Sequence, residues 1–199
     1  MGKMAIALVA VLCAGCGSWT GFGFRADGEE MMRLRQAMSL KQGMTVADVG
    51  AGKGQLTLAL AREVGPTGRV FATEIDAARL QRLREARLGN VTVVEAGNDK
   101  TGLPAECCDA VVLRRVYHHL SDPAAVNASL LQALRPGGAL VVIDFPPPFF
   151  WTRGSLGVPA EDVIEELKRG RFELVRVERD WPGRGPLGSY CALFRKPIH

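Results

Sequence analysis

The sequence predicts an α/β fold in which a mostly parallel sheet carries helices on both faces. Short apolar runs suited to buried strands alternate along the chain with stretches of helical periodicity. A glycine-rich loop follows an early run and leads into a helix. Two late runs, Phe172–Glu178 and Tyr190–Arg195, predict a C-terminal pair of strands.

Each element has a sequence pattern that predicts it. The first expected strand begins at Val46. Four further strands are expected over Val70–Thr73, Val91–Glu95, Asp109–Leu113 and Ala139–Asp144. The expected helices lie over Gly28–Met38, Leu56–Val64 and Pro159–Lys168. A further helix is expected after Asp122, which can cap it with Pro123 at its first position. The apolar side chains that then share one helix face are Val126, Leu130, Leu131 and Leu134.

Composition is typical of one globular domain. The chain has 199 residues, of which 47% are hydrophobic and 23% charged, so it has no room for a second large domain. The net charge of +4 is mildly basic, and the arginines are scattered through helices, which favours solvated helix faces over nucleic-acid binding. Cys107, Cys108 and Cys191 show no zinc spacing, so we expect packing roles for them and no metal site.

The most informative stretch is Val46–Gly54, which joins an apolar strand to a glycine loop and then to a helix. Gly50, Gly52 and Gly54 can adopt backbone angles that other residues avoid, and they let a ligand approach the main chain closely. The loop therefore predicts a nucleotide-type cofactor site. An ordinary strand–helix turn is the alternative, since glycine is the usual residue wherever φ is positive.

The spacing of acidic residues around the loop narrows this choice. Gln55 stands where a dinucleotide fingerprint has its last glycine, which leaves the pattern D-x-G-x-G-x-G beginning at Asp48. Glu74 ends the next strand about 20 residues beyond the loop, where a carboxylate can bind ribose hydroxyls. A solvated carboxylate at a strand end is the alternative for Glu74 and also for Asp99, which follows the third strand.

Together these motifs resemble the class I S-adenosylmethionine (SAM)-dependent methyltransferases that act on small molecules. The resemblance covers roughly residues 40 to 196, and the segments Tyr117–Leu120 and Leu134–Gly138 add to it in the family's order. It implies a Rossmann-like three-layer sandwich with a seven-stranded sheet in the order 3-2-1-4-5-7-6 and a late antiparallel hairpin. It also implies SAM as cofactor and a small-molecule methyl acceptor.

The resemblance assigns roles to individual residues. Gly50–Gly54 would hold the methionine portion, Glu74 the ribose, Ile75 an adenine face and Asp99 the adenine amine. The cofactor-binding residues that it implies are Asp48, Gly50, Ala51, Gly52, Gly54, Glu74, Ile75 and Asp99. A general base is needed only if the acceptor must lose a proton, and Tyr117, His118 or Asp144 can then serve.

Two of these base candidates have a simpler interpretation. Tyr117 suits a core position, and His118 and His119 suit capping or packing roles.

Two cationic positions depart from the family pattern, namely Lys53 within the loop and Arg114-Arg115 after the fourth strand. If they face the site, Lys53 would pair with the cofactor carboxylate and an arginine would select an anionic acceptor. The alternative is that both arginines point to solvent.

The N-terminus predicts a targeting segment. Lys3 precedes the apolar run Ala5–Ala14, and Cys16 follows, which resembles a bacterial lipoprotein signal with Cys16 as the lipidated residue. The expected division is therefore a signal over 1–16, a helical cap over 17–45 that covers the cofactor site, and a methyltransferase domain over 46–199. A membrane-anchored lipoprotein is expected; a misassigned start codon before a cytoplasmic enzyme is the alternative.

Export conflicts with the use of a cytosolic cofactor, and a wrong start site, a cytoplasm-facing anchor or a domain that has kept the fold and lost the activity would each account for this. Two other classes of protein compete with the methyltransferase. One is a lipoprotein module that binds another ligand on this fold without catalysis. The other is a nicotinamide oxidoreductase, against which Gln55 and the late hairpin argue. The segment Phe145–Trp151 holds three prolines and four aromatic residues, so it predicts either a wall of the acceptor pocket or a hydrophobic, membrane-facing patch.

Overall fold

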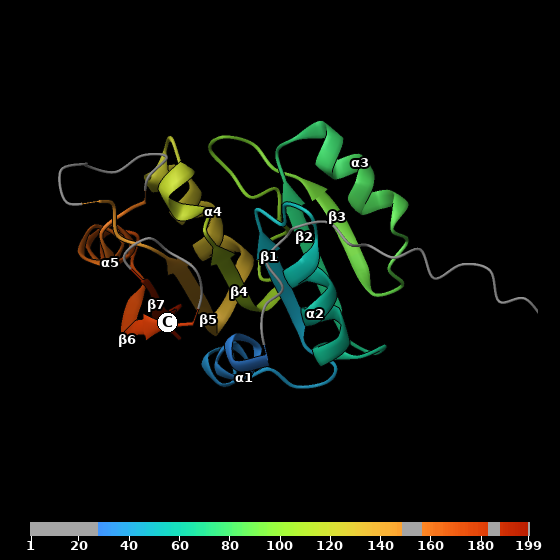
Figure 1. Ribbon diagram of the computed structural model, residues 1–199, viewed down its shortest axis with the longest axis horizontal. Coiled ribbons are helices and arrows are strands. Elements are labelled where there is room, and N and C mark those ends of the chain that lie inside the picture. Colours follow the sequence, from blue (N-terminus) through green and yellow to red (C-terminus); the bar gives the residue numbers. More distant parts are fainter. Residues whose placement is uncertain (1–27, 149–156, 183–187, 199) are drawn as a thin grey trace, which may run out of the picture.

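A computed structural model describes residues 28–148, 157–182 and 188–198. Its seven-stranded sheet has the order β3-β2-β1-β4-β5-β7-β6 (Figure 1), which confirms the expected fold and strand order. The strands are β1 (Thr45–Val49), β2 (Arg69–Glu74), β3 (Val91–Glu95), β4 (Cys108–Arg114), β5 (Leu134–Asp144), β6 (Glu173–Trp181) and β7 (Ser189–Arg195). The predicted signal over 1–16 and the aromatic residues 149–151 lie outside the described residues.

The register of the sheet gathers several strand ends at one edge. Strands β1 to β5 pair in parallel, and β7 runs antiparallel to both β5 and β6. Val49 of β1 is opposite Thr73 of β2 on one side and Leu113 of β4 on the other. In open α/β sheets this carboxyl edge is where ligands bind, so the sheet predicts the position of the site.

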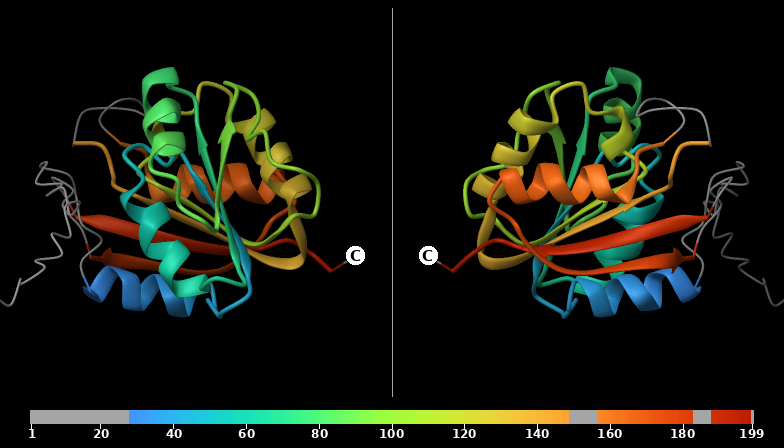
Figure 2. Two further views of the ribbon diagram at one scale, coloured as in Figure 1. Left: turned by 90° about the vertical axis from the view of Figure 1, so that its right-hand side faces the viewer. Right: turned by 90° about the vertical axis from the view of Figure 1, so that its left-hand side faces the viewer.

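Helices cover both faces of the sheet (Figure 2). They are α1 (Gly28–Ala37), α2 (Gln55–Val64), α3 (Ala77–Glu85), α4 (Pro123–Ala133) and α5 (Ala160–Arg169), together with the short 3₁₀ helix η1 (Tyr117–His119). The buried side chains of α1 and α2 pack together on one face, and those of α4 and α5 pack on the other. Helix α1 thus packs against the sheet. Its residue Glu30 forms an ion pair with Arg114, which lies at the carboxyl edge of the sheet.

Local sequence explains where α4 begins and ends. The carboxylate of Asp122 accepts a hydrogen bond of 3.0 Å from the Ala125 amide, and Pro123 occupies the first turn, as expected. Val126 and Leu130 are buried on the helix. Leu134 is also buried, but it has extended backbone angles and begins β5, so its predicted place on the helix is wrong.

Strand β5 starts earlier than expected, because Leu134 pairs with Cys108 ahead of a register shift in β4. The segment Leu134–Gly138, which the family resemblance includes, therefore lies inside the strand, where Gly137 has a φ of 75°. Cys107, Cys108 and Cys191 are free thiols, and Cys108 and Cys191 are buried in the core. Across the described ranges, no helix is long and apolar enough to span a membrane.

Candidate active site

The glycine loop crosses the carboxyl ends of β1 and β2. Gly50, Gly52 and Gly54 all have positive φ angles, of 74°, 56° and 77°. The amides of Gly50 and Ala51 donate to the carbonyl of Thr73 at 2.9 and 2.8 Å, which holds the loop over β2. This loop conformation strongly favours glycine at all three positions.

Two of these glycines are packed closely, while the third faces open space. A Cβ atom on Gly50 would lie 2.4 Å from Val116, and one on Gly54 would lie 2.6 Å from Leu83. A Cβ atom on Gly52 would have the Gly50 carbonyl as its nearest neighbour, at 3.9 Å. The loop is thus fixed at both ends and leaves its central backbone open to a ligand.

Glu74 connects the end of β2 to this loop. Its side chain is 4% exposed, and it accepts hydrogen bonds from the amides of Gly52 at 2.8 Å, Ile75 at 2.9 Å and Asp76 at 3.1 Å. A carboxylate has about four acceptor sites, so these three bonds leave capacity for a ligand hydroxyl. Ile75 follows directly and is 53% exposed, which is unusual for a large apolar side chain. Both side chains suit a nucleoside at this edge.

Asp48 lies below the loop rather than on its open side. It is 2% exposed and accepts a 2.6 Å hydrogen bond from the hydroxyl of Thr57 in α2. Burial raises the pKa of Asp48 to about 6, and the Thr57 hydrogen bond and the charge of Arg114 oppose this rise. The Asp48 side chain therefore supports the base of the loop and the start of α2.

Asp99 is exposed in the loop that follows β3. That loop lies next to Glu74, because the Ala96 amide donates to the Glu74 carbonyl at 2.9 Å. The structure therefore brings the loop that carries Asp99 to the same edge as the glycine loop and Glu74.

His118 and Asp144 form a buried pair where β4 and β5 end. His118 Nδ1 lies 2.8 Å from Asp144 Oδ1 and 3.0 Å from Oδ2, and the two side chains are 4% and 0% exposed. The backbone amides of His118 and Phe145 also donate to the Asp144 carboxylate, at 3.2 and 3.0 Å. The pair adjoins the glycine loop, because Val116 packs against Gly50 two residues before His118.

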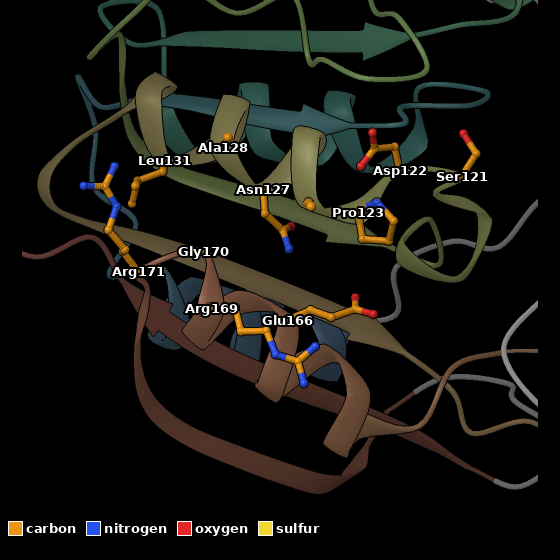
Figure 3. Close-up of a pocket in the computed structure, with 11 residues that line it drawn as sticks. Ser121, Asp122, Pro123, Asn127, Ala128, Leu131, Glu166, Arg169, Gly170 and Arg171 are labelled. Carbon is orange, nitrogen blue, oxygen red and sulfur yellow. The ribbon is translucent and has the colours of Figure 1, made fainter.

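Tyr117 lies elsewhere. It is fully buried, its hydroxyl donates to Glu166 at 3.1 Å, and it accepts from Asn127 at 2.8 Å. Figure 3 shows Asn127 and Glu166 lining a pocket between α4 and α5. Tyr117 therefore has the core position that its simpler interpretation predicts, on the α4–α5 face, and its role as a base stays a prediction.

Among the cationic residues, Arg114 has a position that neither interpretation expected. Arg114 forms a bidentate pair with Glu30, with both N–O distances at 2.7 Å, and the two side chains are 12% and 3% exposed. It therefore links β4 to α1 and does not point to solvent. Arg115 is half-buried with a φ of 59°, and burial and the charge of Arg114 lower its pKa. Lys53 lines a cavity between α2 and α3.

The pairing of Arg114 with Glu30 was missed by sequence reasoning. The two residues are 84 positions apart, and no motif connects them. A buried acidic residue on the first helix opposite a strand-end arginine becomes visible only when the packing of α1 is known. Among the described residues there is no group of three His, Cys, Asp or Glu side chains that could hold a metal ion.

The strand order, the glycine loop and the acid after β2 define the class of protein: a Rossmann-like domain built for a nucleoside-containing cofactor. A family model described as a methyltransferase domain matches residues 47–142. The matched stretch holds the glycine loop, Glu74 and His118, so the chain is similar to methyltransferase domains over the part that contains the candidate site.

Curated relatives support this family. The chain is 34% identical over 113 residues to the ubiquinone/menaquinone biosynthesis C-methyltransferase UbiE of Stutzerimonas stutzeri. The aligned stretch covers 54% of this chain and 44% of that protein. It is 31% identical over 118 residues to UbiE of Shewanella halifaxensis, covering 57% and 47%. The chain thus spans less than half the length of these relatives.

Solved structures share the fold. A SAM-dependent methyltransferase from Aquifex aeolicus superposes with a TM-score of 0.72 at 22% identity, covering 86% of this chain and 92% of that one. The [4+2]-cyclase SpnF superposes with a TM-score of 0.70 at 20% identity, covering 85% and 80%.

Proposed function

We propose that this chain transfers a methyl group from SAM to a small-molecule acceptor. The observation that carries the proposal is the 2.8 Å hydrogen bond between the Gly52 amide and Glu74 Oε2, which joins the glycine loop to the acid at the carboxyl edge. Gly52 leaves open space above the loop, and the exposed Ile75 lies beside the acid. These features suit a ligand that combines a polar amino-acid part, a ribose and an aromatic base.

The residues that would hold the cofactor follow from these positions. The main chain of Gly50–Gly54 would lie against the methionine portion, and Glu74 would accept from ribose hydroxyls. Ile75 would pack on the adenine ring, and Asp99 would accept from the adenine amine. When bound, SAM supplies a methyl group on a positively charged sulfur that is already a good leaving group. The protein's part is then to orient the acceptor and to take up its proton.

His118 is the base in this proposal, and Asp144 holds it in place. The Asp144 carboxylate can only accept, so the proton on the imidazole resides on Nδ1 and Nε2 is the basic nitrogen. Nε2 would take a proton from the acceptor as the methyl group arrives. The UbiE relatives are named as C-methyltransferases of quinone biosynthesis, which supports an acceptor with a ring hydroxyl or an acidic carbon.

Calorimetric titration of SAM and S-adenosylhomocysteine (SAH) into the full-length chain tests the cofactor site. We expect micromolar binding of both, and we expect Gly52→Arg to abolish it because the new side chain occupies the open space above the loop. Gly43→Arg is the matched control, since Gly43 also has a positive φ, of 83°, but lies at the opposite end of β1. Absence of SAH binding to the folded wild type would contradict the proposal.

The second candidate function is a ligand-binding or other module on this fold that does not transfer methyl groups. One observation favours it: SpnF, a [4+2]-cyclase, superposes on this chain over 85% of its length. Incubation with labelled SAM and a panel of phenolic and quinol acceptors separates the two candidates. Labelled product supports methyl transfer, whereas SAH binding without transfer to any acceptor favours the second candidate.

We also propose that residues 1–16 act as a lipoprotein signal and that the domain is tethered to a membrane through Cys16. The apolar run Ala5–Ala14 between Lys3 and Cys16 supports this proposal. In bacterial cells grown with labelled palmitate, we expect the full-length chain to be labelled and Cys16→Ser to be unlabelled. Cys13→Ser is the matched control and should keep the label. An unlabelled wild-type chain would favour the cytoplasmic alternative.

A further inference from the structure

A cavity of about 820 Å³ lies between α2 and α3, and Gly52, Gly54 and Gln55 line it where the glycine loop leads into α2. Its size is within the range of sites that hold small organic ligands. Both helices begin near the carboxyl edge of the sheet and extend away from it (Figure 1), so the cavity has an end near the loop and an end remote from it.

The two ends differ in chemistry. Lys53 of the loop and Arg79 in the first turn of α3 lie at the near end, and Arg82 follows one turn later. The apolar lining residues are Leu58, Leu83, Ala86 and Leu88. Ala86 and Leu88 come after the arginines along the chain and therefore lie toward the remote end.

The positive charge in this cavity is poorly compensated. No acidic residue is among the described residues that line it. Arg79 lies 3.7 Å from Glu74 Oε2 and its side chain is 55% exposed. Within the described ranges, Lys53 and Arg82 have no ion-pair partner. Three cations around one cavity repel one another, so an anion placed between them would be stabilised.

The apolar part of the cavity is preformed. Leu83 is 7% exposed and packs on Gly54, so its side chain is fixed between the loop and the sheet. Leu58 and Leu88 are half-buried and keep apolar surface on the cavity side. Contact with an alkyl chain would remove this surface from water, which is favourable in proportion to the area covered.

We propose that this cavity, called the α2–α3 groove below, binds a single long-chain carboxylate. The headgroup would lie among Lys53, Arg79 and Arg82, where guanidinium groups can donate paired hydrogen bonds to a carboxylate. The alkyl chain would lie along Leu58, Leu83 and Leu88. A small inorganic anion would leave the leucines uncovered, and a neutral chain would leave the cations without a counter-charge. A ligand that complements the cavity therefore has a carboxylate and an alkyl chain in one molecule. Its binding does not depend on methyl transfer.

Titration of decanoate into the full-length protein tests this site. We expect one decanoate per chain, and we expect Arg82→Gln to weaken binding roughly tenfold because one charged hydrogen bond is lost. Arg84→Gln is the matched control, because Arg84 is exposed on the same helix but does not line the groove. Decanol and acetate, which each carry half of the required chemistry, are expected to bind at least tenfold more weakly than decanoate.

Four results would overturn the proposal. Equal decanoate affinities of Arg82→Gln, Arg84→Gln and the wild type would show that the arginine does not bind the carboxylate headgroup. Acetate binding as tightly as decanoate would remove the role of the leucines. Competitive displacement of decanoate by SAH would assign the groove to the cofactor site. Binding to anionic phospholipid vesicles without binding of monomeric decanoate would indicate a membrane-facing patch instead.

Discussion

The Nδ1 atom of His118 lies 2.8 Å from Asp144 Oδ1, where β4 and β5 end side by side. Asp144 is fully buried, and two backbone amides also donate to its carboxylate. These amides fix the carboxylate, and the carboxylate fixes the imidazole, so the orientation of His118 is set before any acceptor binds. This is the arrangement by which a buried acid selects the tautomer of a histidine base.

We expect Asp144→Asn to slow the turnover of an acceptor that loses a proton by roughly 100-fold or more, with little change in SAH affinity. Asparagine keeps the shape of the side chain but can present an NH₂ group to Nδ1, which favours the wrong tautomer. Single-turnover methyl transfer and SAH calorimetry on the same preparation measure the two effects. Asp180→Asn, which changes an 86% exposed carboxylate, is the control. Equal losses of SAH binding and turnover in Asp144→Asn would refute a role confined to the base.

Asp48 is expected to make stability depend on pH. Its pKa of about 6 in the folded state lies above the ordinary value of 3.8 because burial penalises the charged form. The folded chain therefore holds this proton more tightly than the unfolded chain, and stability falls as pH rises from about 4 to 6. Above pH 6 the penalty is constant. Its size is on the order of 3 kcal/mol between the two limits.

The substitution Asp48→Asn should remove this contribution while keeping an oxygen for the Thr57 hydroxyl. Urea unfolding at pH 4.5 and pH 7 measures it for both proteins. We expect the stability of the variant relative to the wild type to be greater at pH 7 than at pH 4.5. A difference that is the same at both pH values would show that Asp48 titrates normally.

The pair Glu30–Arg114 is expected to hold α1 on the sheet. Glu30→Gln leaves a guanidinium that is 12% exposed without its charged partner, so we expect a loss of about 3 kcal/mol in the free energy of unfolding. The double variant Glu30→Leu, Arg114→Met should lose less, because both charges are then absent. Chemical denaturation of the single and double variants gives the coupling. Additive losses would show that the pair contributes no specific interaction.

Much of the fold followed from the sequence because its signals are local. Apolar runs predicted the strands β1 to β4 within one or two residues, and Asp122-Pro123 predicted the start of α4. The beginning of β5 was not predictable in this way. Leu134 leaves the helix because it pairs with Cys108 on a neighbouring strand, and such a contact between distant residues has no local pattern.

The site was predictable to the extent that single residues determine the backbone. The three glycines indicated positive φ angles, and all three have them. The direction of neighbouring side chains was not predictable, since Tyr117 and His118 are adjacent in sequence but reach different partners. Their directions depend on the 3₁₀ geometry of η1 and on what α4, α5 and β5 place around it. The roles of the cofactor-binding residues stay predictions until binding is measured.

Arg115 is expected to contribute to acceptor selection. It lies half-buried at the carboxyl edge, and the charge of Asp144 acts on it there. We expect Arg115→Ala to raise KM for an anionic acceptor more than it raises the Kd of SAM. Steady-state kinetics with an anionic and a neutral acceptor, together with SAM calorimetry, measure the two effects. Equal weakening of acceptor and SAM would show that Arg115 acts on the fold of the site as a whole.

Tyr117 provides the complementary test, because its role is now expected to be structural. The substitution Tyr117→Phe removes a hydroxyl that bridges Asn127 and Glu166. The Asn127 Oδ1 atom is already buried without a hydrogen bond. In the variant, Asn127 Nδ2 loses its hydrogen bond to the Tyr117 hydroxyl as well. We therefore expect a loss of about 1 to 3 kcal/mol in the free energy of unfolding, with turnover unchanged at a temperature where the variant is folded. Thermal denaturation and steady-state kinetics measure both. Turnover that is slowed roughly 100-fold at wild-type stability would restore Tyr117 as a candidate base, because a core residue that is merely structural affects activity through folding.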